Sequence, residues 1–172
     1  MSKRLLQIYT GNGKGKTTAA TGLMLRALGQ NWRVLLVRFL KPVEPVSGEL
    51  IILRQLSGID IIDAELGGVY SAADRLEIAR DVQQTLARAK DRLAEGYDLV
   101  VFDEFNGLFR RGYLELGEAL ELLDGWPAQT ELVLTGRHAP AELIKRADLV
   151  TSMEALRHPF EQGIGARQGI EY

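Results

Sequence analysis

Short apolar runs alternate with longer amphipathic segments along most of the chain. The runs that indicate strands occupy residues 5–9, 33–39, 59–62, 98–103, 131–135 and 149–150. Short runs rich in valine, isoleucine and leucine are typical of buried strands. Val34 to Val37 is continuously apolar, which indicates a strand covered on both faces.

The segments between these runs are predicted to be helices, at residues 16–28, 49–56, 71–93, 114–123 and 140–146. The longest has the clearest helical spacing, carried by Leu76, Ala79, Val82, Leu86, Ala89 and Leu93. Ser71 is its predicted N-cap, and Gly29 and Gly96 are predicted to end two of the helices. Strands that alternate with helices predict an α/β fold with a mostly parallel sheet of about five to six strands flanked by helices.

Length and charge limit the classes of function. The 172 residues fit one domain, with an irregular tail at about 152–172. A formal net charge of -2 provides no overall basic field for nucleic acid or an anionic membrane. No apolar run is long enough to span a membrane, and residues 1–9 lack the features of a signal peptide, so the expected location is the cytoplasm.

Residue types exclude several kinds of chemistry. The chain has no cysteine, so disulfides, thiolate nucleophiles and cysteine metal sites are ruled out. It has two histidines, His138 and His158, which are predicted to be structural or solvent-exposed rather than catalytic.

A glycine-rich loop connects the first predicted strand to the first predicted helix. It reads Thr10-Gly11-Asn12-Gly13-Lys14-Gly15-Lys16-Thr17-Thr18. Glycines let backbone N–H groups point inward, and the helix N-terminus also favours an anion. Lys16 would place an ammonium at the outer phosphates of ATP, and the Thr17 hydroxyl would ligate Mg²⁺. Residues 11–18 are therefore predicted to bind ATP, as in a P-loop NTPase-like fold; the alternative is a glycine-rich turn without a ligand.

Two carboxylates, Asp103 and Glu104, end the fourth predicted strand. In open α/β sheets, ligands bind at the carboxyl ends of the strands, so either acid is a candidate to hold Mg²⁺ together with Thr17. The alternative is that one of them caps the following helix. Arg137 follows the next strand and is a candidate ATP contact; a surface salt bridge explains it equally well.

The loop and the Asp103-Glu104 pair occur with further segments in an order that resembles the P-loop corrinoid adenosyltransferases, which act on cob(I)alamin or cob(I)yrinic acid a,c-diamide. The further matching segments are Phe39-Leu40-Lys41, Ser47-Gly48-Glu49, Leu134-Thr135-Gly136-Arg137, Ala147-Asp148-Leu149-Val150-Thr151, His158-Pro159-Phe160 and Gly169-Ile170-Glu171-Tyr172. The usual phosphate loop begins with glycine where this chain has Thr10, and that departure is itself a trait of the family.

The resemblance implies that cobalt(I) of a reduced corrinoid attacks the 5′ carbon of ATP and inorganic triphosphate leaves. It implies Mg²⁺ and a homodimer, with a flavoprotein as a candidate reductant. Lys16, Thr17 and Glu104 would be the catalytic residues; Lys41, Glu49 and Tyr70 are candidates for the corrinoid side.

Two departures from the family change the expected substrate. The first strand starts near Leu5, so an N-terminal cover over the corrinoid is expected to be missing or to come from elsewhere. Family members often carry a Phe-x-Trp segment where this chain has Gly67-Gly68-Val69-Tyr70-Ser71. The hypothesis is that the acceptor is an incomplete corrinoid without the lower base. The competing functions are a P-loop kinase or ATPase, which would release ADP, and a non-catalytic ATP-binding module, which would release nothing.

Overall fold

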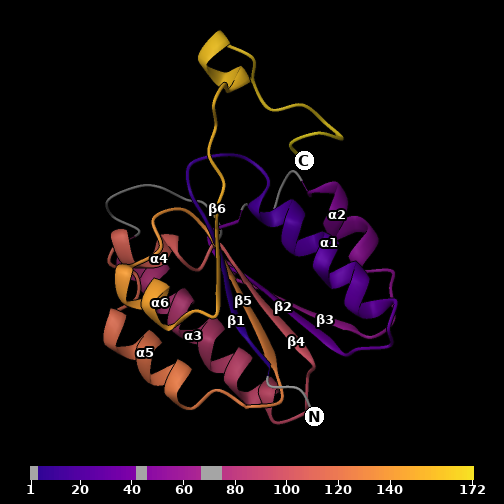
Figure 1. Ribbon diagram of the computed structural model, residues 1–172, viewed down its shortest axis with the longest axis vertical. Coiled ribbons are helices and arrows are strands. Elements are labelled where there is room, and N and C mark those ends of the chain that lie inside the picture. The colour runs from indigo at the N-terminus through magenta and orange to yellow at the C-terminus, as the bar shows by residue number, and fades with distance from the viewer. Residues whose placement is uncertain (1–3, 42–45, 67–74) are drawn as a thin grey trace.

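The computed structural model describes residues 4–41, 46–66 and 75–172. Its centre is a six-stranded sheet, ordered β3-β2-β4-β5-β1-β6, in which every neighbouring pair is parallel (Figure 1). The strands are β1 Leu6–Thr10, β2 Val34–Arg38, β3 Ile59–Asp63, β4 Leu99–Asp103, β5 Glu131–Thr135 and β6 Leu149–Ser152. The predicted α/β class is confirmed, and the sheet is parallel throughout.

Helices cover both faces of the sheet (Figure 1). One face carries α1 Lys16–Leu28 and α2 Gly48–Leu53, and the other carries α3 Arg75–Leu93, α4 Gly107–Arg110, α5 Leu116–Asp124 and α6 Ala141–Arg146. The core therefore has two halves, one on each side of the sheet. All five residues of β4 are buried, as expected for a central strand between two helical layers.

Helix α1 has both of its predicted ends, and Gly29 follows it. Gly29 has φ −63°, so it ends the helix without the left-handed conformation that glycine usually supplies there. The predicted N-cap, Ser71, lies outside the described residues, and so does Tyr70, the candidate for the corrinoid side. The single-turn helix α4 was not predicted, because four residues are too few to show a helical period.

The buried face of α3 differs from the predicted one at its start. Leu76 is 72% exposed, whereas Ile78 is 2% exposed and packs in the core with Val82 and Leu86. Ile78, Val82 and Leu86 are four residues apart and lie on one face of the helix. Leu76 is two residues before Ile78 and so points to the opposite side. Including it in the apolar face was wrong.

The chain beyond β6 forms an extended tail with one 3-10 turn, η2 Pro159–Gln162. The imidazole of His158 accepts a hydrogen bond from the Phe160 N–H at 3.2 Å and caps this turn, a structural role. The tail rises past the carboxyl end of β6 and turns back toward the start of α1 (Figure 1). No helix within the described residues is both long and apolar enough to cross a membrane.

Candidate functional site

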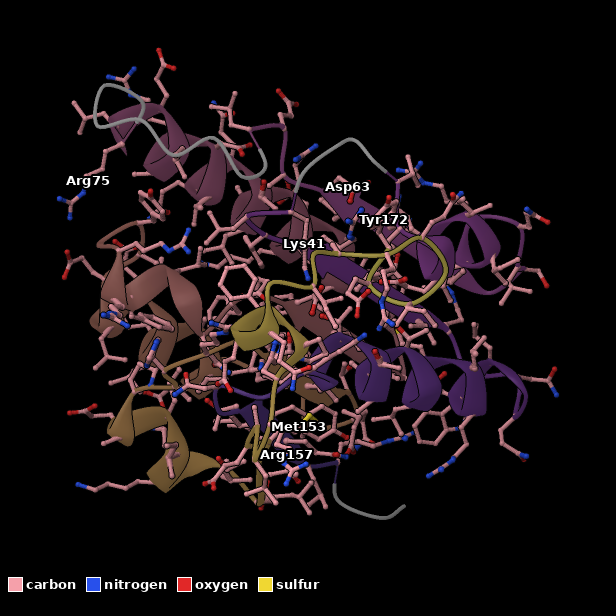
Figure 2. All side chains as sticks on the ribbon, turned by 90° about the horizontal axis from the view of Figure 1, so that it is seen from above. Lys41, Asp63, Arg75, Met153, Arg157 and Tyr172 are labelled. Carbon is pink, nitrogen blue, oxygen red and sulfur yellow. The ribbon has the colours of Figure 1, made fainter. Side chains whose placement is uncertain are left out.

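The carboxyl ends of the parallel strands bring the predicted site residues to one edge of the sheet. The glycine-rich loop follows β1, Lys41 follows β2 closely, Asp103 ends β4 and Arg137 follows β5. Figure 2 looks down on this edge and labels Lys41, together with Met153 and Tyr172 of the tail. Open α/β sheets bind their ligands at this edge.

Two glycines of the loop are required because the tail passes directly against it. The Gly13 N–H donates a 2.7 Å hydrogen bond to the Met153 carbonyl. A Cβ atom on Gly11 would lie 2.3 Å from that oxygen, and one on Gly13 would lie 2.8 Å from it. Gly11 and Gly15 also have φ of 93° and 114°, which side chains other than glycine rarely adopt.

The hydroxyl of Thr10, at the first position of the loop, makes a structural hydrogen bond. Its Oγ1 accepts a hydrogen bond from the Ala139 N–H at 3.2 Å, and its carbonyl accepts one from the Met153 N–H at 2.9 Å. Thr10 therefore connects the loop to the tail and to the turn that carries Arg137. A glycine in this place would lose the first of these contacts.

The Lys16 side chain is enclosed by the loop. It is 7% exposed, and its Nζ donates to the carbonyls of Gly11 at 2.9 Å and Gly13 at 2.6 Å. Burial lowers the pKa of Lys16, and the nearby Glu104 carboxylate partly opposes that shift. The ammonium contacts only carbonyl dipoles in these bonds, so an anion entering the loop would be a stronger partner for it.

Thr17 and Thr135 contact Asp103, and Lys41 lies close to both Asp103 and Glu104. Asp103 is 2% exposed, and its Oδ1 accepts from the Thr17 hydroxyl at 2.9 Å and the Thr135 hydroxyl at 2.6 Å. Lys41 Nζ lies 3.4 Å from Asp103 Oδ2 and 3.7 Å from Glu104 Oε1. Burial lowers the pKa of Lys41, but the two carboxylates raise it by more, so the net shift is upward.

Neither carboxylate caps α4. The N-cap of α4 is Asn106, and no side chain accepts a capping hydrogen bond there. Glu104 has φ 62°, a left-handed conformation that is strained for a residue with a side chain, and its N–H donates to the Thr135 hydroxyl at 3.0 Å. The alternative that Asp103 or Glu104 caps the following helix is therefore wrong.

The donor set suits a magnesium ion that is completed by a ligand. The described residues contain no group of three or more histidine, cysteine or acidic side chains placed to hold a metal. Mg²⁺ commonly takes one or two carboxylates and completes its shell with phosphate oxygens and water. Asp103, Glu104 and the Thr17 hydroxyl supply that partial set of hard oxygen donors.

A cavity of about 830 Å³ lies between the loop and the tail. Gly11, Asn12, Lys14 and Arg137 line one side, and Glu154, Phe160, Glu161 and Glu171 are among the tail residues that line the other. Lys14 donates to the Ile170 carbonyl at 2.9 Å and to Glu171 Oε1 at 2.8 Å, which connects the two walls. Hydrogen bonds from Arg167, and then from Lys14, hold the pKa of Glu171 at about 2.

The remaining predicted residues lie at the margins of this group. Thr18 is exposed in the first turn of α1. Glu49 lies in the first turn of α2 and lines a small pocket together with Ser47, Thr17 and Asp103. Thr135 and Met153 were not singled out from the sequence, although Thr135 is a polar residue ending a predicted buried strand, a feature that Asp103 shares.

Comparisons with known proteins show which family this chain is similar to. A family model described as "ATP:corrinoid adenosyltransferase BtuR/CobO/CobP" matches residues 2–172. A corrinoid adenosyltransferase of Pseudomonas aeruginosa is 34% identical, covering 98% of this chain and 83% of the relative. One of Escherichia coli is 32% identical, covering 98% and 85%. The cytoplasmic domain of EssC matches in structure with a TM-score of 0.52 at 14% identity; the match covers 96% of this chain but only 34% of that chain, and it shows the fold alone.

Proposed function

We propose a route for the reaction that this chain catalyses. The chain belongs to the ATP:corrinoid adenosyltransferase family and transfers the adenosyl group of ATP to a corrinoid. Cobalt(I) of the reduced corrinoid attacks the 5′ carbon of ATP with its electron pair. A cobalt–carbon bond forms, the bond from the 5′ carbon to oxygen breaks, and its electron pair leaves with inorganic triphosphate. Cobalt is thereby oxidised to cobalt(III).

The observation that supports this route is the enclosed Lys16 beside the Thr17–Asp103–Glu104 group at one edge of the sheet. The glycine-rich loop would hold the triphosphate through its N–H groups and Lys16, which stabilise charge on the leaving group. Thr17, Asp103 and Glu104 would hold Mg²⁺, which supplies further positive charge to the phosphate oxygens. Attack by a metal centre on carbon transfers no proton, so orientation and charge stabilisation are the tasks left to the protein.

The cavity between loop and tail would hold the rest of ATP. Lys14 and Arg137 on the loop side suit phosphates, whereas Glu154, Glu161 and Glu171 on the tail side suit ribose hydroxyls. Phe160 lines this wall and is 76% exposed, so its ring is available to stack on the base. This division of charge orients ATP with its triphosphate in the loop and its nucleoside under the tail.

The corrinoid side rests on Lys41, Glu49 and Tyr70, of which Tyr70 lies outside the described residues. Because the chain has Gly67-Gly68-Val69-Tyr70-Ser71 where relatives of this type often carry Phe-x-Trp, the acceptor is proposed to be a corrinoid without the lower base. A homodimer, a flavoprotein reductant, a cytoplasmic location and a single domain over 1–172 complete the proposal. Light scattering on the purified chain tests the dimer.

The test is an anaerobic assay with ATP, Mg²⁺ and chemically reduced corrinoids. The absorbance change on cobalt–carbon bond formation reports transfer, and phosphorus NMR identifies the product of ATP. Inorganic triphosphate supports the route, whereas ADP would point to a kinase or ATPase and unchanged ATP to a binding module. A clear preference for complete cobalamin over base-free corrinoids would contradict the proposed acceptor.

A further inference from the structure

The ammonium of Lys41 lies among the oxygens that we propose as magnesium ligands. Its Nζ is 3.3 Å from Thr17 Oγ1, 3.4 Å from Asp103 Oδ2 and 3.7 Å from Glu104 Oε1. Magnesium binds its oxygens at about 2.0–2.1 Å and demands a nearly ideal octahedron. An ion bound to these three groups would therefore exclude the ammonium from its position.

The backbone brings Lys41 to this place. The Phe39 N–H donates to the Asp103 carbonyl at 3.0 Å, which extends the contact of β2 with β4 past the end of the strand. Leu40 has φ 52°, a left-handed conformation that is strained for leucine, and its side chain is 8% exposed. Buried side chains on both residues fix this turn, so Lys41 starts from a defined point next to the carboxylates.

The carboxylates require a cation when no metal is bound. Asp103 is 2% exposed, and a buried carboxylate without a counter-charge is costly. Other nearby cations have different partners: Lys16 donates to the loop carbonyls, and Arg38 pairs with Asp63 at 2.8 Å. Lys41 is the cation that contacts both Asp103 and Glu104 within the described parts of the chain.

We propose that Lys41 is a resident counter-ion that a divalent metal must displace, so that the site binds metal more tightly together with the triphosphate than alone. Without phosphate, the metal competes with the ammonium for the same oxygens. With ATP present, phosphate oxygens complete the metal's shell and offer the displaced ammonium a new anionic partner. This inference rests on the proposed metal site and assigns Lys41 a positioning role in loading it.

The first experiment measures binding of Mn²⁺, a paramagnetic probe for Mg²⁺, by electron paramagnetic resonance without nucleotide. Lys41→Met removes the competing charge at similar length and should tighten Mn²⁺ binding about tenfold. Lys41→Arg keeps the charge and should stay within about threefold of the unmodified chain. Lys145→Met, on the exposed surface of α6, makes the same change in net charge and should have no effect. Equal or weaker binding by Lys41→Met would overturn the proposal.

A second experiment needs no variant at Lys41, in case that substitution prevents folding. Amine-selective labelling, followed by mass spectrometry of peptides, compares Lys41 with Lys145 at Mn²⁺ concentrations that occupy the site. Displacement should speed labelling of Lys41 several-fold, on the order of threefold or more, and leave Lys145 unchanged. Unchanged labelling of Lys41 would overturn the proposal, and so would the absence of Mn²⁺ binding in every form of the chain.

Neither experiment depends on adenosyl transfer. If the Lys41 effect is seen but no cobalt–carbon bond forms, the proposed reaction is contradicted and the inference about Lys41 is supported. If the adenosyl group is transferred but no Lys41 effect is seen, the reaction is supported and the inference is contradicted.

Discussion

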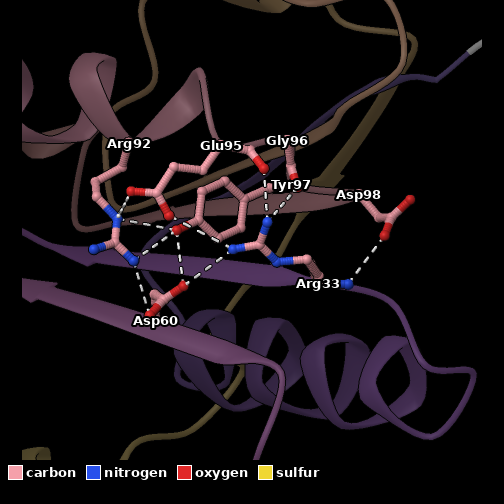
Figure 3. Close-up of polar contacts among 7 residues, drawn as sticks. All are labelled: Arg33, Asp60, Arg92, Glu95, Gly96, Tyr97 and Asp98. Atoms are coloured by element: carbon pink, nitrogen blue, oxygen red, sulfur yellow. Dashed lines mark hydrogen bonds and ion pairs between the residues drawn. The ribbon is translucent and has the colours of Figure 1, made fainter.

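At the amino edge of the sheet, charged side chains pair with one another, whereas at the carboxyl edge they surround an open cavity. Figure 3 shows the amino-edge cluster: Arg33, Asp60, Arg92, Glu95, Gly96, Tyr97 and Asp98. There the Tyr97 hydroxyl donates to Asp60 at 2.8 Å and accepts from Arg92 at 2.9 Å. Arg92 also pairs with Asp60 at 2.9 Å. Each group in this cluster has a partner within the chain.

The carboxyl edge holds its groups in less favourable conformations. Of the described non-glycine residues with positive φ, Leu40, Glu104 and His138 lie in its loops, and Asn31, a residue type that tolerates this conformation, lies in a turn after α1. Lys16 contacts carbonyls, and one ammonium serves both Asp103 and Glu104. Strained backbone and partly matched charges are typical of sites whose partner is a ligand. The amino edge is therefore expected to contribute stability, and the proposed chemistry lies at the carboxyl edge.

The largest expected effect is a loss of activity on substitution of Lys16, at the carboxyl edge. Lys16→Ala removes the ammonium from the loop and should lower the rate of adenosyl transfer by about 100-fold or more, because stabilisation of the leaving triphosphate is lost. The anaerobic absorbance assay measures this, with Lys145→Ala as the control that keeps activity. Near-normal activity of Lys16→Ala would remove the loop from the mechanism.

The next effect tests the proposed metal ligands at the carboxyl edge. Glu104→Gln should weaken Mn²⁺ binding in the presence of ATP and lower adenosyl transfer, each by about tenfold or more, because a charged oxygen donor is lost. Calorimetry and the absorbance assay measure the two quantities. Full retention of both by Glu104→Gln, with their loss in Asp103→Asn, would assign the metal to Asp103 alone.

At the amino edge, the same kind of substitution should act on stability. Tyr97→Phe removes a hydroxyl that bonds both Asp60 and Arg92 and should lower the free energy of unfolding by about 1 kcal/mol. Urea unfolding at neutral pH measures this loss, and adenosyl transfer should be unchanged. A loss of transfer in a stably folded Tyr97→Phe chain would mean that the two edges are not separate.

The pH dependence of that loss sharpens the comparison. The hydrogen bond from Tyr97, followed by that from Arg92, holds the pKa of Asp60 below its ordinary value of 3.8, although burial opposes the shift. A carboxyl whose pKa is lowered on folding stabilises the protein above its unfolded pKa and loses that contribution as pH falls through the folded pKa. The stability difference between Tyr97→Phe and the unmodified chain should therefore shrink as urea unfolding is repeated below pH 3.8. A difference that grows toward acid would contradict this assignment.

The smallest effect concerns the tail. Glu171→Gln weakens the contact with Lys14 and Arg167 and should raise the KM for ATP by about two- to threefold, because exposed ion pairs contribute little. Steady-state kinetics measures this, with kcat expected to stay the same. A lower KM would mean that the tail competes with ATP and does not enclose it.

The sequence alone determined the six strands and most of the helices, and it indicated the candidate site. Strand period, helix period and the glycine-rich loop are local patterns, so β1, the loop and α1 could be placed from consecutive residues. The same holds for Asp103 and Glu104, because a polar pair at the end of a buried strand must emerge at its carboxyl end. The prediction for the start of the apolar face of α3 was wrong at Leu76, because the helical period by itself does not say which of two nearby apolar residues, Leu76 or Ile78, packs against the sheet.

Only the tertiary structure decided which of these groups touch. Strand order places Thr135 of β5 beside Asp103 of β4, and β6 beside β1 carries Met153 onto Gly13. The contact of Lys41 with both carboxylates depends on the turn at Leu40 against the end of β4. Such contacts join residues distant in the chain, and their geometry follows from how the whole sheet and its helices pack. Local sequence patterns identify the chemical groups, but the packing of the whole fold decides that Asp103 and Glu104 both contact the Lys41 ammonium.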